Sequence, residues 1–90
     1  MKPTFLELRH LRTLLALKET GSVSMAAKRV YLTQSALSHQ IKLMEEQFGL
    51  PLFERKSNPL RFTAAGDRLI RLANEILPKV VDAERELARV

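Results

Sequence analysis

The chain has 90 residues, 46% of them apolar, and carries fifteen Lys and Arg against ten Asp and Glu. This length fits one domain, and because the chain has no cysteine, disulfides, thiolate metal sites and cysteine nucleophiles are excluded. His10 and His39 lie far apart and cannot form a zinc site alone, no apolar run is long enough to span a bilayer, and the first residues lack the apolar core of a signal peptide. We therefore expect a small, basic, soluble domain of the cytoplasm, with no cofactor and no bound metal.

A first helix is predicted over residues 5–19. Thr4 and Glu7 stand three residues apart, the spacing of a capping box in which a threonine oxygen and a glutamate satisfy free backbone N–H groups. Leucines follow at helical intervals. We expect Gly21 to end the helix, because glycine readily adopts the left-handed conformation common at helix C-termini.

Two further helices are predicted in the middle of the chain. A short one is expected over residues 24–30, with Ser22 or Ser24 as its N-cap. A tight connection leads to a longer one over residues 33–48, which carries an apolar stripe at helical spacing. Gly49-Leu-Pro51 ends this helix, since proline cannot continue it.

A basic turn between two short apolar segments follows the third helix. The apolar segments are residues 50–54 and 60–62, and the link between them is Arg55-Lys-Ser-Asn-Pro59. Asparagine and proline in so short a polar link indicate a turn. We therefore predict a small β-hairpin with a basic tip.

The last helix is expected to begin after Thr63 and has the most regular pattern in the chain. Its apolar positions alternate at spacings of four and three, as in the a/d seam of a coiled coil. The seam consists of Leu69, Ala73, Ile76, Val80, Ala83, Leu87 and Val90. At about 1.5 Å per residue the helix outreaches the preceding globule, so we assign the seam to dimerisation. The alternative is that it packs on its own domain, and Pro78 is expected to kink or open the helix.

The positive charge is unevenly distributed. Residues 1–66 carry ten basic and five acidic side chains, whereas residues 67–90 carry five of each. A basic globule with a neutral helical tail suggests that the first part binds a polyanion and that the tail has another role. Solubility alone is the plainer explanation of a charge of this size.

The order of these elements is that of a winged helix-turn-helix, in which the first residues of the longer helix face base edges in the major groove. We therefore predict base contacts from Gln34, Ser35, Ser38 and His39. Glutamine can form a bidentate pair with adenine, and histidine can reach guanine N7 or a phosphate. The plainer interpretations are that Thr33 or Ser35 caps the helix and that His39 is an ordinary solvated residue.

The chain resembles the LysR-type transcriptional regulators over nearly its whole length. Each motif is weak alone, but their order and spacing are highly specific. The matching segments are Leu8-Arg-His-Leu11, Gly21-Ser-Val-Ser-Met-Ala-Ala27, Thr33-Gln-Ser-Ala-Leu-Ser-His-Gln-Ile41, Met44-Glu45, Phe48-Gly-Leu-Pro-Leu-Phe-Glu-Arg55 and Leu60-Arg-Phe-Thr-Ala-Ala-Gly66. Residues 33–40, 55–63 and 72–78 look closest to the family's regulators of methionine biosynthesis.

The resemblance implies a mainly α fold. A winged helix-turn-helix, with three helices and a hairpin wing, would occupy residues 1–62, and a linker or dimerisation helix residues 63–90, with the family's C-terminal effector-binding domain absent from this chain. Gln34, Ser35, Ser38 and His39 take the base-reading positions. The resemblance and the positive charge assign contacts to the DNA backbone to Ser24, Thr33, Lys42, Arg55, Lys56, Ser57, Asn58 and Pro59. His39 stands where many members have arginine, and it lacks the bidentate guanidinium that makes a strong guanine contact.

The resemblance implies a bacterial regulator that binds an interrupted inverted repeat in double-stranded DNA as a homodimer, through antiparallel linker helices. Its targets would be genes of methionine or other amino-acid metabolism. Tetramers and a small-molecule effector are expected only through the absent domain, and no membrane is involved. Catalysis is not expected, because Ser35, Ser38 and His39 lie along one exposed helix of a domain with little room for a cleft. The alternative is a helical protein-interaction module with a non-specific basic surface.

Overall fold

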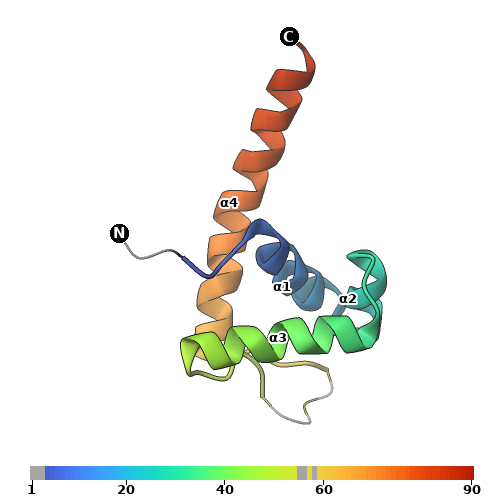
Figure 1. The fold of residues 1–90 in the computed structure, drawn as a ribbon, viewed down its shortest axis with the longest axis vertical. Coiled ribbons are helices and arrows are strands. Elements are labelled where there is room, and N and C mark those ends of the chain that lie inside the picture. The colour runs from blue at the N-terminus through green and yellow to red at the C-terminus, as the bar shows by residue number, and fades with distance from the viewer. Residues whose placement is uncertain (1–3, 55–56, 58) are drawn as a thin grey trace.

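Four helices make up most of the computed structural model, which describes residues 4–54, 57 and 59–90 (Figure 1). They are α1 (Leu8–Thr20), α2 (Val23–Arg29), α3 (Gln34–Phe48) and α4 (Ala64–Ala88). α1 packs against both α2 and α4, and α2 packs against α3, while the second half of α4 rises beyond the other helices. Among the described residues, no helix is both long enough and apolar enough to cross a bilayer. The expected mainly α architecture is confirmed.

The start of α1 differs from the prediction. Glu7 is the N-cap, with an extended backbone, and its N–H donates to Nδ1 of His10 at 2.9 Å. Phe5 stacks on the imidazole of His10, with ring centroids 4.9 Å apart, and packs against the core. The capping box predicted at Thr4 is therefore wrong, because core packing of Phe5 keeps residues 5–7 out of the helix.

His10 makes the stability of this helix start depend on pH. Burial, and secondarily the positive charge of Arg9, lowers the pKa of His10 against the opposing effect of Glu7. As the pH falls below about 6.5, the unfolded chain therefore takes up a proton before the folded chain does, so stability is lost on acidification. The protonated Nδ1 can no longer accept the N–H of Glu7, and removing a cap interaction of this kind costs about 1 kcal/mol.

We expect the free energy of unfolding to fall as the pH is lowered below about 6.5, and the variant His10→Gln to lack much of this fall. Glutamine also caps from this position but does not titrate near neutral pH. Urea unfolding of both proteins at several pH values measures the difference. Equal pH dependence in the two proteins would contradict the role given to His10.

Side-chain caps set the register of α2 and α3. The Ser22 hydroxyl accepts from the N–H of Met25 at 3.2 Å, and the Thr33 hydroxyl accepts from the N–H of Ala36 at 3.0 Å. Ser22, and not Ser24, is therefore the cap of α2. Thr33 caps α3, as one of the two interpretations of this residue predicted. The predicted bounds of α2 and α3 agree with the structure within about one residue.

The core lies between α1 and its neighbours and consists of two clusters that share partly buried residues at their boundary. The first joins α1, α2 and α3, and the second joins α1, α3, the wing and α4. The fully buried large apolar side chains are Leu14, Leu17, Leu37, Met44 and Leu52. Because α1 contributes to both clusters, it holds the helix-turn-helix against α4.

The wing, residues 50–62, is less regular than a hairpin. Among its described residues the two apolar segments meet in one antiparallel bridge, between Phe53 and Phe62, whose rings lie 4.7 Å apart. The N–H of Glu54 donates to the carbonyl of Arg61 at 3.0 Å. The predicted pairing is therefore present, but it is shorter than two regular strands. The core holds the base of the wing through these phenylalanine rings.

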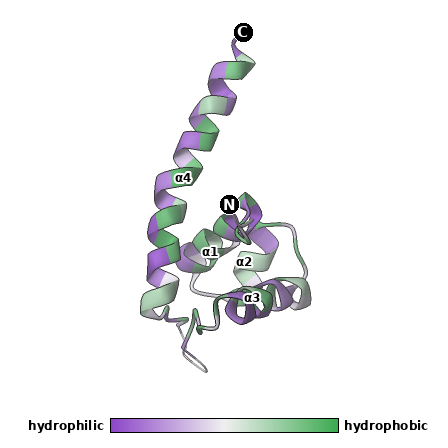
Figure 2. Ribbon diagram, turned by 60° about the vertical axis from the view of Figure 1, so that its left-hand side comes forward, coloured by the Kyte–Doolittle hydropathy of each residue, from purple (hydrophilic) through white to green (hydrophobic). Residues whose placement is uncertain are grey.

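α4 continues through Pro78 without a break in the helix. Its seam divides into two parts. Leu69 and Ile76 are partly buried and Ala73 is completely buried within this single chain, whereas Leu87 is 72% exposed. The assignment of Ala73 to a dimer contact is therefore wrong, because its face of α4 closes the chain's own core. Figure 2 shows the distal half of α4, with its alternating apolar and polar positions, standing clear of the other helices.

Candidate nucleic-acid interface

The first two turns of α3 present a polar surface to solvent. Ser35, His39 and Lys42 follow at spacings of four and three, so they share one face of the helix. All three are exposed, and so is Gln34 in the first turn. The opposite face carries Leu37, which is fully buried in the core. The apolar stripe thus determines how α3 is rotated, and that rotation turns the predicted base-reading residues outward.

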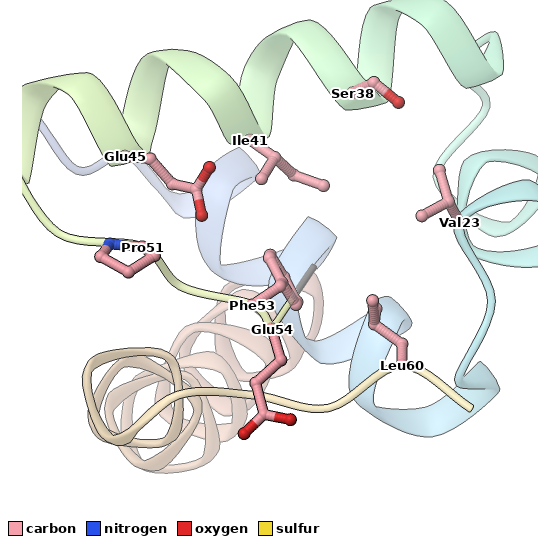
Figure 3. Close-up of a pocket in the computed structure, with 8 residues that line it drawn as sticks. All are labelled: Val23, Ser38, Ile41, Glu45, Pro51, Phe53, Glu54 and Leu60. Carbon is pink, nitrogen blue, oxygen red and sulfur yellow. The ribbon is translucent and has the colours of Figure 1, made fainter. Parts of the chain in front are cut away.

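Ser38 faces a different direction from Ser35 and His39. It lines a cleft of about 280 Å³ between α3, the start of α2 and the wing (Figure 3). The cleft is also lined by Val23, Ile41, Glu45, Pro51, Phe53, Glu54 and Leu60. The structure therefore places Ser38 on the wing side of the exposed surface, next to apolar side chains, although it remains exposed to solvent.

Charge varies along α3. Its acidic residues, Glu45 and Glu46, both lie in the C-terminal half, whereas Lys42 precedes them. Oε2 of Glu45 accepts the backbone N–H of Leu52 at 2.7 Å, which ties the wing to α3. The sequence pattern did not predict this hydrogen bond of Glu45. The only local sign of it was the position of Glu45 beside the apolar stripe of α3. A polyanion would meet least repulsion at the N-terminal half of α3, where free N–H groups also favour anions.

The wing residues predicted to contact the DNA backbone differ in what the structure describes. Arg55, Lys56 and Asn58 lie outside the described residues. The hydroxyl of Ser57 donates to the carbonyl of Glu54 at 3.1 Å and accepts the N–H of Arg61 at 2.9 Å. Ser57 therefore closes the turn and has no hydrogen left to donate to a phosphate.

The remaining residues predicted to contact the DNA backbone lie either near the wing or at α3. Pro59 is exposed, and so is Ser24, which lies near the start of α2. That end of α2 lies close to the wing, because the N–H of Leu60 donates to the carbonyl of Gly21 at 3.4 Å. Thr33, the N-cap of α3, and Lys42, on α3 itself, are also exposed. The structure thus brings the start of α2, the first half of α3 and the wing to one region.

Residues 8–67 match the bacterial regulatory helix-turn-helix proteins of the lysR family. The chain belongs to the LysR family. It is 89% identical to the HTH-type transcriptional regulator MetR of Haemophilus influenzae over 90 residues, which are all of this chain and 29% of that protein. It is 50% identical to MetR of Escherichia coli K12 over 78 residues, 87% of this chain and 25% of that protein. The chain thus spans less than a third of the length of these LysR relatives.

The fold is also that of solved LysR structures. The DNA-binding domain of BenM, in its complex with benA site 1 DNA, superposes with a TM-score of 0.84 at 36% identity, covering 93% of this chain and 94% of that one. The LysR family, expected from the sequence motifs, is confirmed, and the chain is similar to the MetR members of that family.

Proposed function

We propose that this LysR chain is the DNA-reading head of a transcriptional regulator and binds double-stranded DNA sequence-specifically. The observation that carries the proposal is the first half of α3, which presents polar and basic side chains from a capped helix start and contains no acidic residue. The likeness to the BenM domain, whose structure contains DNA, supports DNA binding by this fold. The two MetR relatives support control of genes of methionine or other amino-acid metabolism, in the bacterial cytoplasm.

In this proposal α3 enters the major groove with its first residues towards the bases. Gln34, Ser35 and His39 reach base edges, and Ser38 contacts the strand on the wing side. Ser24, Thr33, Lys42, Pro59 and the basic tip of the wing at Arg55, Lys56 and Asn58 contact phosphates. Ser57 acts indirectly, because its hydroxyl holds the turn that carries this tip.

Two such heads would be joined through α4. The apolar side chains of the distal half, Val80, Ala83, Leu87 and Val90, belong to neither core cluster of the described residues and form the remaining part of the seam. Residues 1–62 would read DNA and residues 63–90 would pair, with the first turns of α4 also completing the core of the head. Twofold symmetry then requires an inverted repeat whose half-sites lie about one helical turn, or a multiple of it, apart.

Selection of bound duplexes from a random library at physiological salt tests this function. The expected result is enrichment of an interrupted inverted repeat. Binding without enrichment would reduce the function to electrostatic attachment. Absence of binding would favour the alternative, a helical protein-interaction module. Exchange of Arg55 and Lys56 for glutamate should abolish DNA binding but leave pairing through α4 intact.

Gln34→Ala is expected to reduce discrimination at one base pair of the selected site by about 1–3 kcal/mol, because the variant cannot form the bidentate pair with adenine. Lys56→Ala is expected instead to weaken binding to all duplexes similarly, as phosphate contacts do. Competition of the selected site and its single-base variants against random DNA measures both effects. If the two variants weaken binding by the same factor on selected and random duplexes, the assignment of Gln34 to base reading is wrong.

A further inference from the structure

An arginine-rich cleft lies on the side of α3 away from the wing. It has a volume of about 300 Å³ and lies where α1, the turn between α2 and α3, and α3 meet. Its polar lining comprises Arg9 and Arg12 of α1, Arg29 of α2, Tyr31 of the turn and Gln40 of α3, together with Thr13. The roles proposed above use none of these residues.

The arginines of this cleft are available to an anion. Arg9 pairs with Glu7 at 3.1 Å and Arg29 with Glu19 at 3.0 Å, but all four side chains are more than half exposed. Exposed pairs of this kind contribute little and exchange readily for another anionic partner. Arg12 is exposed and makes no ion pair among the described residues. Phosphate is a suitable partner, since guanidinium groups bind it with paired hydrogen bonds.

Tyr31 has an unusual backbone for so large a side chain. The backbone φ of Tyr31 is 58°, in the left-handed region. Among the described residues, Tyr31 is the one non-glycine residue with a positive φ. This conformation is unfavourable for a residue with a Cβ, and the side chain is 95% exposed, so packing within the fold does not compensate the cost. The turn thereby holds a hydroxyl donor beside the arginines and immediately before the start of α3.

The direction of successive α3 side chains relates this cleft to the groove-facing surface. At about 100° per residue, Ser38, His39 and Gln40 point in successive directions around the helix. Ser38 points to the wing side and His39 outward, while Gln40 points to the arginine-rich cleft. Gln40 thus lies at the boundary between α3 and α1, and its buried Oε1 has no hydrogen-bond partner among the described residues.

A helix about 10–12 Å wide fills a major groove about 12 Å wide, so the two DNA backbones rise on either side of it. The wing and the start of α2 flank α3 on one side, and the arginine-rich cleft flanks it on the other. We propose that this cleft binds phosphates of the backbone on the α1 side of α3, with Arg12 as the principal contact. Arg9, Arg29 and the Tyr31 hydroxyl would contact the same strand. This inference rests on the DNA-binding function proposed above.

The test compares the salt dependence of DNA binding in single-arginine variants. Arg12→Gln is expected to weaken binding to the selected duplex and to random duplex by similar factors, several-fold or more. It should also reduce the slope of log affinity against log salt by about 0.9 for each phosphate that the variant no longer neutralises, hence about 1.8 for a dimer. Arg12→Lys keeps the charge and should retain the wild-type slope. Arg29→Gln should reduce both the affinity and the slope, in the same direction as Arg12→Gln.

The matched control is Arg71→Gln, which removes the same charge from an exposed position on α4. Circular dichroism establishes that each variant is folded. If Arg12→Gln changes the slope no more than Arg71→Gln does, the cleft does not bind phosphate, and an acidic protein partner becomes the better explanation of the arginines. If the wild-type chain itself fails to bind DNA, the function proposed for the domain is wrong, which is a distinct outcome.

Discussion

Replacing Leu87 by aspartate is expected to lower the affinity for an inverted-repeat duplex by about 100-fold or more, because the two heads no longer bind as one unit. Leu87 is 72% exposed in the single chain, so the substitution should leave the fold of the head intact. A buried carboxylate on each side of a symmetric seam is strongly unfavourable. Affinity for a duplex with one half-site should change little. Binding titrations on both duplexes, with sedimentation analysis of the free protein, measure these effects.

Ala88→Asp is the matched control for Leu87→Asp. It introduces the same charge one residue later, about 100° around the helix and off the seam. This control should remain dimeric and bind the inverted repeat as the wild type does. If both variants bind it equally well, the distal half of α4 is not the pairing surface and the seam has another partner.

Gly66→Ala is expected to be the most destabilising of the substitutions considered for the head. Gly66 lies in the first turn of α4, and a Cβ there would overlap the backbone carbonyl oxygen of Leu52 and crowd the ring of Phe62. Thr63 holds this close approach, since its N–H donates to the carbonyl of Leu52 at 3.0 Å and its hydroxyl to the carbonyl of Pro51 at 2.7 Å. Overpacking of this kind costs up to about 3 kcal/mol, which corresponds to roughly 12–24 °C in Tm for a domain of this size.

Helix propensity alone predicts the opposite sign for Gly66→Ala, because alanine is favoured over glycine in a helix by about 1 kcal/mol. The steric cost is larger, since the atom that the new Cβ would meet belongs to the backbone and cannot rotate away. Gly49→Ala is the control: its φ is 66°, but its Cβ would meet open space, so only the conformational cost of about 1 kcal/mol applies. Thermal unfolding of both variants decides the matter. A smaller decrease in Tm at Gly66 than at Gly49 would contradict the steric argument.

The local pattern of the sequence was sufficient for α2, α3 and the start of α4. Ser22 and Thr33 are among the residues that the spacing nominated as caps, and Thr63 accepts the N–H of Gly66 as predicted. These signals are local, because a cap needs only a backbone N–H two or three residues away. The outward direction of Ser35 and His39 also follows locally, since the period of the apolar stripe orients the whole helix.

The beginning of α1 was not accessible to the same reasoning. Thr4 and Glu7 have the spacing of a capping box, yet Phe5 stacks on His10 and packs against the core. Burial of an aromatic ring of this size outweighs one cap interaction. Tertiary packing thus selected Glu7 as the N-cap, and no property of residues 4–7 alone distinguishes the two starts.

What the sequence by itself determined is the order of the helices, the caps of α3 and α4, the polar face of α3 and the family, because each depends on neighbouring residues or on motifs of fixed spacing. What only the tertiary structure decided is which apolar residues face which neighbour. Ala73 and Leu87 occupy equivalent positions of one seam, but the first is buried in the half of α4 that packs on the head and the second is exposed. The arginine-rich cleft joins Arg12, Arg29 and Gln40 from three helices. Their proximity arises from packing at long sequence separation, which no local periodicity contains.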